Sequence, residues 1–448
     1  MNKDMKEIDF EESQKLDNSQ NLKLQNVTKS NLKYLFYFFI PLILIIICFL
    51  FFSKKGNLDK DKQNTDDSFV TKLDRNNFKN ILNERKIFEM NYSYEPYMNI
   101  DKSISYEQNA DIIYNKTGIL NITKLDYYYS GILKDTSKLN HIHISMGFDV
   151  NFIELSSIAI SSVLNTSNPN TYIHLHIMAI DFSFKHMKKI IQLKRLHDNI
   201  DFIFYNSIQA EYDFGERAKK EYRGIGDYTR ILSPEIVNDT DRILIVDTGD
   251  VIAQKDISEV YNFDLEDNIF GWILEDTAGN ENADENKFFR NNFYPNTGIC
   301  LINVKLWREN NLYKKSILVS RAYHVLPCPY QDIIFVVSDF KFKYMPLKYN
   351  CKLFFENDEQ MKNRDVNSKY IKKWIENQKY SPYRYSVEEI LEAAIDPVIN
   401  HIYQEKIYKG VGCNKLTMQW IKYAMTSGFY EEIKKKYPIP FDSCGHLL

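Results

Sequence analysis

Apolar and polar positions follow two rhythms from residue 140 onward, and these rhythms predict strands and helices in turn. Short apolar runs, typical of buried strands, occur at residues 141–148, 171–180 and 201–206. Amphipathic stretches, typical of helices, occur at residues 153–164, 182–196 and 227–236. Alternation at this spacing favours an α/β fold with a mostly parallel sheet and helices on both faces.

The stretch 242–253 organises this pattern. Its apolar residues Ile243 to Val246 predict a strand buried on both faces, and Asp247 and Asp250 follow in a turn. Two carboxylates this close repel each other, and a Mg²⁺ or Mn²⁺ ion would remove that repulsion because hard cations prefer oxygen ligands. In open α/β sheets, ligands bind outside the carboxyl ends of the strands. A solvated turn rich in Asp and Gly is the alternative explanation of the pair taken alone.

An apolar segment without charged residues precedes the sheet, at residues 34–53, between Lys33 and Lys54. Its length matches one bilayer-spanning helix, which needs about 20 apolar residues. A cleaved signal peptide is disfavoured because the run is long, begins late and lacks a small-residue cleavage site. A buried helix of a soluble domain is disfavoured because such helices rarely stay apolar all round. We therefore expect a single transmembrane helix.

The chain then divides into five parts. These are a cytoplasmic tail (1–33), the transmembrane anchor (34–53), a stem with an irregular lead-in (54–138), the sheet-bearing domain (139–405) and a C-terminal helical extension (406–448). Lysines flank the span on both sides, so charge does not decide its orientation. Most Asn-X-Ser/Thr sequons follow the span, which favours glycosylation of a lumenal C-terminal domain, in the Golgi or the endoplasmic reticulum.

Composition narrows the function classes. The chain has 448 residues, 44% of them hydrophobic and 26% charged, which is an ordinary globular balance. A net charge of −3 argues against nucleic acid as a partner. The six Cys have no metal-like spacing, and one or two disulfides are possible. Histidines alternate on the first two predicted strands, and buried or hydrogen-bonded imidazoles are favoured over metal ligands for His141, His143, His174 and His176.

Three further stretches carry candidate chemistry. Asp149, Asn151 and Phe152 follow the first strand, where polar groups can bind a ribose or base and an aromatic ring can stack on the base. Arg230 lies on the helix before the organising strand and offers several donors to a diphosphate or carboxylate. Asn296 precedes a buried strand, where its amide could bind sugar hydroxyls. Taken alone, the two turns are more readily explained as structural.

In this order and spacing, the stretches resemble glycosyltransferase family 8, the retaining, nucleotide-sugar-dependent enzymes that include glycogenin and lipooligosaccharide galactosyltransferases. The resemblance covers residues 141–401. The family's D-x-N-Y motif is matched by Asp149, Asn151 and Phe152, and its Y-x-R motif by Tyr228 and Arg230. Its DxD motif is matched by Asp247 and Asp250. Its F-N-x-G-x-x-L-I-N-x-x-x-W-R motif is matched by Asn296, Gly298, Leu301, Ile302, Asn303, Trp307 and Arg308.

The chain also departs from the family pattern. One extra residue separates the carboxylates of the DxD motif, so that strict spacing would put Thr248 in place of the first Asp. The family's D-Q-D segment keeps Gln331 and Asp332, but Tyr330 replaces its first Asp. His401 is retained, whereas the family's lysine-containing tail is not, so the lysine would be Lys406 or Lys409.

The resemblance implies a nucleotide-binding α/β fold and a UDP-sugar bound through Mn²⁺ or Mg²⁺, with Asp247, Asp250 and His401 as metal ligands. It implies nucleotide contacts from Asp149, Asn151, Phe152, Arg230, Asp247 and Lys406. The residues facing the transferred sugar and the acceptor would be Gln331, Asp332, Asn296 and Asp276, with Glu275 as the alternative to Asp276.

The implied reaction moves a hexose or pentose to a glycan, lipid or protein acceptor with retention of configuration. We take Gln331 as a positioning residue because an amide is a weak nucleophile. Two alternatives stay open: a non-catalytic nucleotide- or sugar-binding protein on a degenerate transferase fold, which the departures favour, and an adhesion or scaffold protein.

Overall fold

The computed structural model describes residues 124–129 (backbone only), 136–180, 182–218, 225–275, 294–322, 328–352, 369–378, 383–402, 407–409 and 413–444. The expected cytoplasmic tail and transmembrane anchor lie outside these ranges. Within them, the structure contains no helix with the length and apolar character needed to cross a bilayer.

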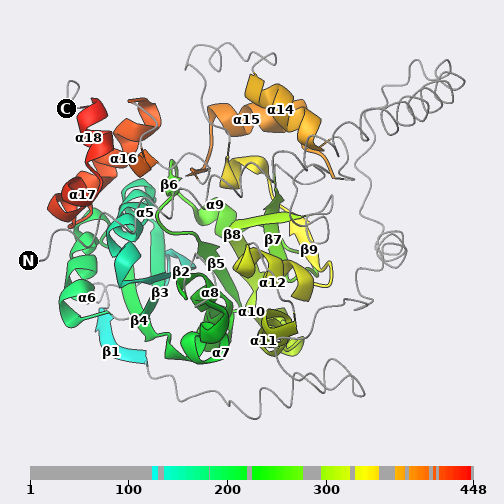
Figure 1. Cartoon of the computed structure of the whole chain (residues 1–448). Helices are drawn as coiled ribbons and strands as arrows, with labels where there is room; N and C mark the ends of the chain where they lie inside the picture. The colour runs from blue at the N-terminus through cyan, green and yellow to red at the C-terminus, as the bar shows by residue number, and fades with distance from the viewer. Residues whose placement is uncertain are drawn as a thin grey trace, which may run out of the picture. The chain divides into compact units, whose positions relative to one another are not determined.

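Eight strands form the main sheet, in the order β1-β4-β3-β2-β5-β8-β7-β9 (Figure 1). Their bounds are β1 Lys124–Tyr129, β2 Asn140–Asp149, β3 Thr171–Ile180, β4 Ile200–Asn206, β5 Arg242–Val246, β7 Phe270–Leu274, β8 Pro295–Asn303 and β9 Phe342–Tyr344. Two short strands pair antiparallel in a second sheet, β6 Val251–Ala253 and β10 Ile399–His401.

The helices described are α5 Ile153–Thr166, α6 Phe184–Ile191, α7 Ile208–Ala218, α8 Gly226–Ile236, α9 Ser258–Tyr261, α10 Val304–Glu309, α11 Leu312–Ala322, α12 Pro329–Val337, α14 Lys369–Asn377, α15 Val387–Ile395, α16 Lys415–Thr426, α17 Tyr430–Lys436 and α18 Pro438–Cys444. The predicted helix at 182–196 begins only at residue 184, because Ser183 accepts a hydrogen bond from His186 N and caps it. The helix ends in a 3-10 segment, η3 Gln192–Leu196.

Strand directions confirm the mostly parallel sheet. Strands β4, β3, β2 and β5 pair in parallel, and β7 and β9 run the same way. Strand β8 is antiparallel to both of its neighbours, β5 and β7, and β1 is antiparallel to β4. The apolar pattern cannot show this reversal, because a strand buried on both faces has the same pattern in either direction.

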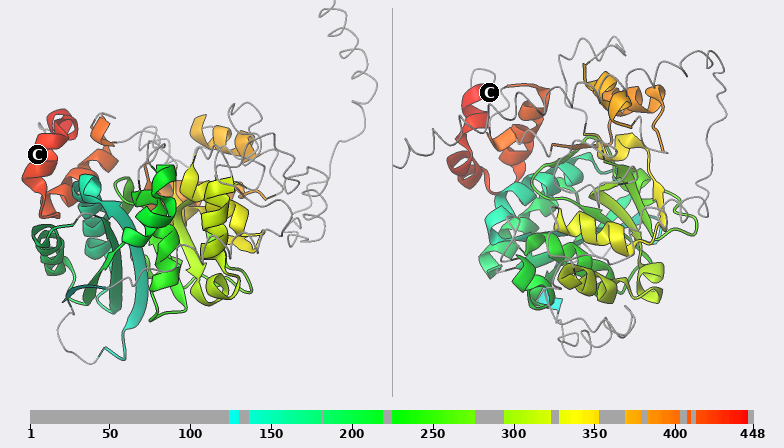
Figure 2. Two further views of the ribbon diagram at one scale, coloured as in Figure 1. Left: turned by 60° about the horizontal axis from the view of Figure 1, so that its bottom comes forward. Right: turned by 45° about the vertical axis from the view of Figure 1, so that its right-hand side comes forward.

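The path of the chain through the sheet places helices on both faces. The chain steps from β2 to β3 to β4, and β5 then returns to the opposite side of β2. Right-handed crossovers put the connections α5 and α6 on one face, and the reversed step puts α7 and α8 on the other (Figures 1 and 2). The strand order therefore changes direction between β2 and β5, which is where open α/β sheets bind ligands.

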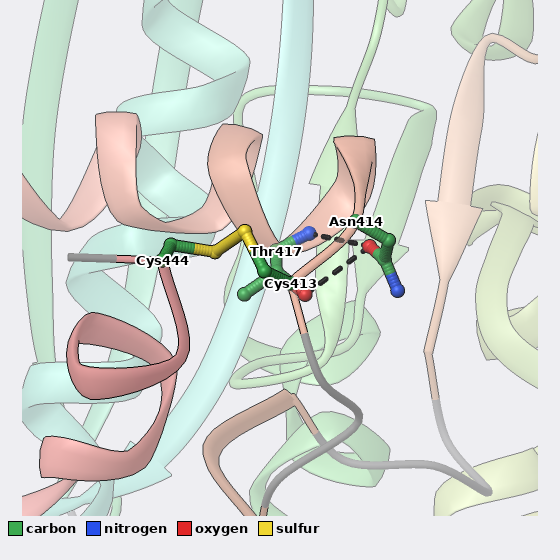
Figure 3. Close-up of a disulfide and its surroundings, with 4 residues drawn as sticks. All are labelled: Cys413, Asn414, Thr417 and Cys444. Atoms are coloured by element: carbon green, nitrogen blue, oxygen red, sulfur yellow. Dashed lines mark hydrogen bonds between the residues drawn. A yellow bond between two sulfur atoms is a disulfide. The ribbon is translucent and has the colours of Figure 1, made fainter. Parts of the chain in front are cut away.

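The C-terminal part of the chain contains the helices α16, α17 and α18. Helix α16 packs on α5, and a disulfide joins Cys413, which precedes α16, to Cys444 at the end of α18 (Figures 1 and 3). Asn414 caps α16 by accepting hydrogen bonds from the backbone and side chain of Thr417. The structure thus contains one of the disulfides that the sequence allowed.

Candidate active site

Two carboxylates and an imidazole converge just beyond β5. The side chains of Asp247, Asp250 and His401 each offer one ligand atom, and these atoms lie within 4.8 Å of one another. His401 Nε2 is 3.8 Å from Asp247 Oδ2 and 3.8 Å from Asp250 Oδ1. The structure therefore brings together the three residues that the sequence predicted as metal ligands.

The turn after β5 makes this convergence possible despite the extra residue in the motif. Gly249 has φ +94°, a left-handed conformation that glycine adopts without steric strain. This bend returns the chain toward β5, so that the carboxylates of Asp247 and Asp250 face the same point. Strand β10 brings the third group, since His401 is paired with Val251 of β6, and Ile402 N donates to Asp250 O at 2.7 Å.

The two oxygens of Asp247 have different surroundings. Oδ1 accepts hydrogen bonds from Arg230 Nη2 at 2.7 Å and from Thr248 N at 2.7 Å, whereas Oδ2 faces His401. Arg230 Nη2 also donates to Asp227 at 2.8 Å. Burial lowers the pKa of Arg230, but the nearby Asp247 and Asp227 raise it more, so the guanidinium stays charged. Arg230 thus orients Asp247, and its predicted contact with a nucleotide stays a prediction.

The orientation of the His401 ring follows from a chain of hydrogen bonds. Gly298 N donates to Asn296 Oδ1 at 3.1 Å, so that this atom is an acceptor. Asn350 Nδ2 donates to the same oxygen at 2.8 Å, which leaves Asn350 Oδ1 facing His401 Nδ1 at 3.0 Å. Because a carbonyl oxygen only accepts, His401 Nδ1 carries the hydrogen. In the neutral ring, the lone pair of Nε2 then points toward the two carboxylates.

This arrangement fits a divalent cation. Carboxylate oxygens and a neutral imidazole nitrogen suit Mn²⁺ and related ions, and the hydrogen bond from Nδ1 is the kind of outer contact that fixes a ligating histidine. Gly298 leaves the space that the ring occupies, since a Cβ there would lie 2.2 Å from His401 Cε1. Burial of the ring, 3% exposed, holds it in place.

A buried ion pair supports Asn296 from the other side. Asn296 Nδ2 donates to Glu275 Oε2 at 2.9 Å, and Lys352 Nζ donates to Glu275 Oε1. Burial alone lowers the pKa of Lys352, and the adjacent Glu275 carboxylate compensates for that cost by stabilising the ammonium. Asn350 and Lys352 were not predicted from the sequence. They lie far from the motifs along the chain, and no spacing links them to Asn296 or His401.

The turn after β2 has the exposure that a nucleotide contact needs. Asp149 Oδ1 accepts from Asn151 N at 2.8 Å, which fixes the turn. Phe152 is 42% exposed, an unusual state for a large aromatic ring at the end of a buried strand. From helix α17, Lys436 Nζ donates to Asn151 O at 2.9 Å.

The two remaining polar candidates lie at the start of α12. Gln331 Oε1 accepts from Thr297 N at 3.1 Å, so its amide is held against β8. Asp332 is 1% exposed and accepts from Tyr294 Oη and from Cys328 N, which points to a structural role in starting the helix. Asp276 and Lys406 lie outside the described residues, as does the side chain of Lys409.

Tyr330, which departs from the family pattern, packs against the arginine of the site. The guanidinium carbon of Arg230 lies 5.1 Å from the centre of the buried Tyr330 ring. A ring in this position attracts the cation without adding a third carboxylate near Asp227 and Asp247. Tyr330 therefore contacts Arg230 through its ring and not through a carboxylate.

Comparison with known proteins agrees with this geometry. Residues 143–375 match the family model described as glycosyl transferase family 8, more than half of the chain. A Haemophilus influenzae protein described as a candidate glycosyltransferase is 26% identical over 146 residues, which are 32% of this chain and 44% of that protein. The chain thus matches less than half of that relative's length.

Two solved structures are similar to the chain. The bifunctional glycosyltransferase WbbM is 16% identical with a TM-score of 0.50, over 69% of this chain and 53% of that one. The galactosyltransferase LgtC is 20% identical with a TM-score of 0.47, over 66% of this chain and 100% of that one. The similarity to WbbM shows that the two chains share an α/β fold with a mostly parallel sheet. The chain belongs to glycosyl transferase family 8.

Proposed function

We propose that this protein is a metal-dependent glycosyltransferase that moves a hexose or pentose from a UDP-sugar to a glycan, lipid or protein acceptor, with retention of configuration. The observation that carries the proposal is the convergence of Asp247 Oδ2, Asp250 Oδ1 and His401 Nε2 at the edge of the sheet where the strand order reverses. A bound Mn²⁺ or Mg²⁺ would supply positive charge against the departing diphosphate.

Other residues of the site would bind the nucleotide and position the transferred sugar. Asp149 and the exposed ring of Phe152 would hold the ribose and base, and Arg230 would keep Asp247 oriented. Gln331, held by Thr297, would position the transferred sugar together with Asn296. Glu275 is paired with Lys352 and Asn296, so we assign it to orienting Asn296 instead of contacting the acceptor directly.

For location, the proposal is a single-pass membrane protein whose C-terminal domain lies in the lumen of the Golgi or the endoplasmic reticulum. The apolar segment at residues 34–53 and the sequons after it support this topology. The disulfide between Cys413 and Cys444 supports an oxidising compartment, since cytosolic thiols are kept reduced.

Release of UDP from a panel of UDP-sugars, with and without Mn²⁺, tests the proposed function. We expect release that depends on Mn²⁺ and that falls by about 100-fold or more in Asp247→Ala, because losing a ligand removes several kcal/mol of charge stabilisation. The exposed Asp267, in the turn before β7, gives a control in Asp267→Asn. Nucleotide binding without turnover of any UDP-sugar would instead support a non-catalytic binding protein.

A further inference from the structure

Four histidines form a row of stacked rings on β2 and β3, away from the candidate active site. His143 and His174 are paired in register, and their rings stack with centroids 4.3 Å apart. His141 stacks on His174 at 5.2 Å, and His143 on His176 at 5.3 Å. Asp149 follows His143 by six positions along β2, which is about 20 Å of extended chain. The row is therefore distinct from the site at the other end of the strand.

The outer half of the row is occupied by its own hydrogen bonds. His141 Nε2 donates to the carbonyl oxygen of Thr136 at 2.9 Å, so His141 Nδ1 accepts from His174 Nε2 at 2.9 Å. His174 Nδ1 lies 3.1 Å from Asp201 Oδ2, and Tyr172 donates to the other oxygen of Asp201 at 2.8 Å. Every ring nitrogen of this half thus has a protein partner, as the sequence predicted for hydrogen-bonded imidazoles.

The inner half has a different geometry. His143 Nδ1 and His176 Nε2 lie 3.0 Å apart, and Asp239 Oδ1 lies 4.0 Å from His143 Nδ1. In two neutral rings, only one of the facing nitrogens carries a hydrogen, so the other presents a lone pair to it. Two nitrogens bound to one tetrahedral zinc ion are about 3.3 Å apart, given Zn–N bonds of about 2.0 Å. The pair is thus already spaced as two ligands of one ion.

We propose that His143, His176 and Asp239 bind a divalent transition-metal ion, with Zn²⁺ as the best match, and that the ion fastens the turn before β5 to β2 and β3. The three ligand atoms lie within 4.8 Å of one another. Two imidazoles and one carboxylate are the donor set of many three-ligand zinc sites, which keep a fourth position for water.

The surroundings match those of a metal site. His176 is fully buried, and its second nitrogen, Nδ1, is 3.0 Å from Tyr205 Oη, an outer contact that fixes the ring. The side chain of Asp239 is 45% exposed, which gives an ion a route from solvent.

Zinc binding to the full-length protein tests the proposal. The protein carries Asp247→Asn, which weakens the candidate active-site ligands, and is treated with a chelator before titration with Zn²⁺. We expect one equivalent of bound zinc, and an affinity at least about tenfold lower when Asp239→Asn is added. Because Asp239 is exposed, this change leaves the core intact. Asp241→Asn, an exposed carboxylate of the same turn, is the matched control and should leave the affinity unchanged.

A second readout does not depend on stoichiometry. Zinc should raise the melting temperature of the Asp247→Asn protein, and this shift should disappear in the Asp239→Asn/Asp247→Asn protein, because an ion that binds only the folded state stabilises it. UDP release by the Asp239→Asn single variant should stay at the wild-type level. The proposal is overturned if the Asp247→Asn protein takes up no zinc, or if Asp239→Asn leaves both affinity and melting shift unchanged.

Discussion

At the level of single atoms, Asp247 serves two purposes with its two oxygens. Oδ1 accepts from Arg230 and from Thr248 N, and this fixes the carboxylate so that Oδ2 faces His401. The lone pair of His401 is directed in the same way, by Asn350 on the far side of the ring. The geometry therefore depends as much on the groups behind the ligands as on the ligands themselves.

The space left by one glycine gives a direct test of this geometry. In Gly298→Ala, the new Cβ would lie 2.2 Å from His401 Cε1 and 2.6 Å from its Nδ1, so the ring has to move. We expect an affinity for Mn²⁺ at least about tenfold lower, because Nε2 of His401 no longer faces the carboxylates of Asp247 and Asp250. The measurement is UDP release as a function of Mn²⁺ concentration.

A second glycine provides the control. Gly215 lies in α7, where the nearest atom to an added Cβ is Glu211 Cγ at 3.5 Å, an ordinary contact. Gly215→Ala should therefore keep the manganese dependence of the wild type and stabilise the helix by up to about 1 kcal/mol. Unchanged manganese dependence in a folded Gly298→Ala protein would remove His401 from the ligand set.

The sequence identified the residues of the site better than it identified their supports. Asp247, Asp250 and His401 stand in motifs, so their residue types and order could be matched to a family. Asn350 and Lys352 stand in no motif, and they reach Asn296 and His401 only through folding of distant segments. Hydrogen-bond partners of this kind leave no periodic signal in the chain.

Among the secondary-structure elements, one aspartate joins three segments. Asp256, between β6 and α9, accepts from Ser258 N at 2.7 Å, from Asn168 N at 2.5 Å and from Thr171 Oγ1 at 2.8 Å. Burial raises the pKa of Asp256, but these hydrogen bonds together lower it further, so the net shift is downward. The carboxylate thus stabilises the start of β3 against the segment after β6.

This downward shift predicts how stability depends on pH. The unfolded chain binds the proton of Asp256 more readily than the folded one, so the contribution is complete above the unfolded pKa, 3.8, and is lost as pH falls below it. We expect Asp256→Asn to lower the free energy of unfolding at pH 7 by about 1–2 kcal/mol. The difference from wild type should shrink in acid, as measured by urea unfolding at a series of pH values.

Asp264→Asn is the control for that series, because the side chain of Asp264 accepts a local hydrogen bond, from Glu266 N at 2.9 Å. At neutral pH, Asp264→Asn should lower the free energy of unfolding by less than Asp256→Asn does. An Asp256→Asn penalty that is the same at pH 3 and pH 7 would show that charge on Asp256 does not contribute.

A buried ion pair links the element β7 to the chain after η4 Leu347–Asn350. Lys352→Met would leave the buried Glu275 carboxylate without its cation, and we expect a loss of about 3–5 kcal/mol in unfolding free energy. Adding Glu275→Gln removes the uncompensated charge and should restore part of that stability. A double-mutant cycle by urea unfolding measures the coupling, and purely additive losses would contradict it.

The elements themselves were largely predictable, whereas their pairing was only partly so. The periodic pattern predicted β2 to β5 and the helices α5, α6 and α8, because local periodicity sets those elements, but it did not predict α7. The antiparallel β8 and the pairing of β10 with β6 join segments far apart in the chain. From the sequence, only the order of the motifs suggested that His401 lies beside Asp250. The structure gives the physical reason, because β10 pairs with β6 and places His401 opposite Val251.

Across the whole of the described chain, the C-terminal helices contact the turn predicted to bind the nucleotide. Lys436 of α17 donates to Asn151 O and lies 3.1 Å from Glu154 Oε2, while Lys189 of α6 pairs with Glu432. Helix α17, which follows the region matched by the family model, therefore contacts two places: the turn before α5, and helix α6, which follows β3.

The disulfide that closes this segment gives the last prediction. Replacing both Cys413 and Cys444 by Ser frees a closed loop of 31-residue separation, which should lower the free energy of unfolding by about 3–4 kcal/mol. Looser C-terminal helices would also hold Asn151 less firmly, so KM for the UDP-sugar should rise while manganese dependence stays. Dithiothreitol should reproduce both effects in wild type and in Cys328→Ser, a control at a cysteine outside the disulfide. It should have no further effect on the double variant. Equal stability of wild type with and without reductant would show that this disulfide does not hold the segment in place.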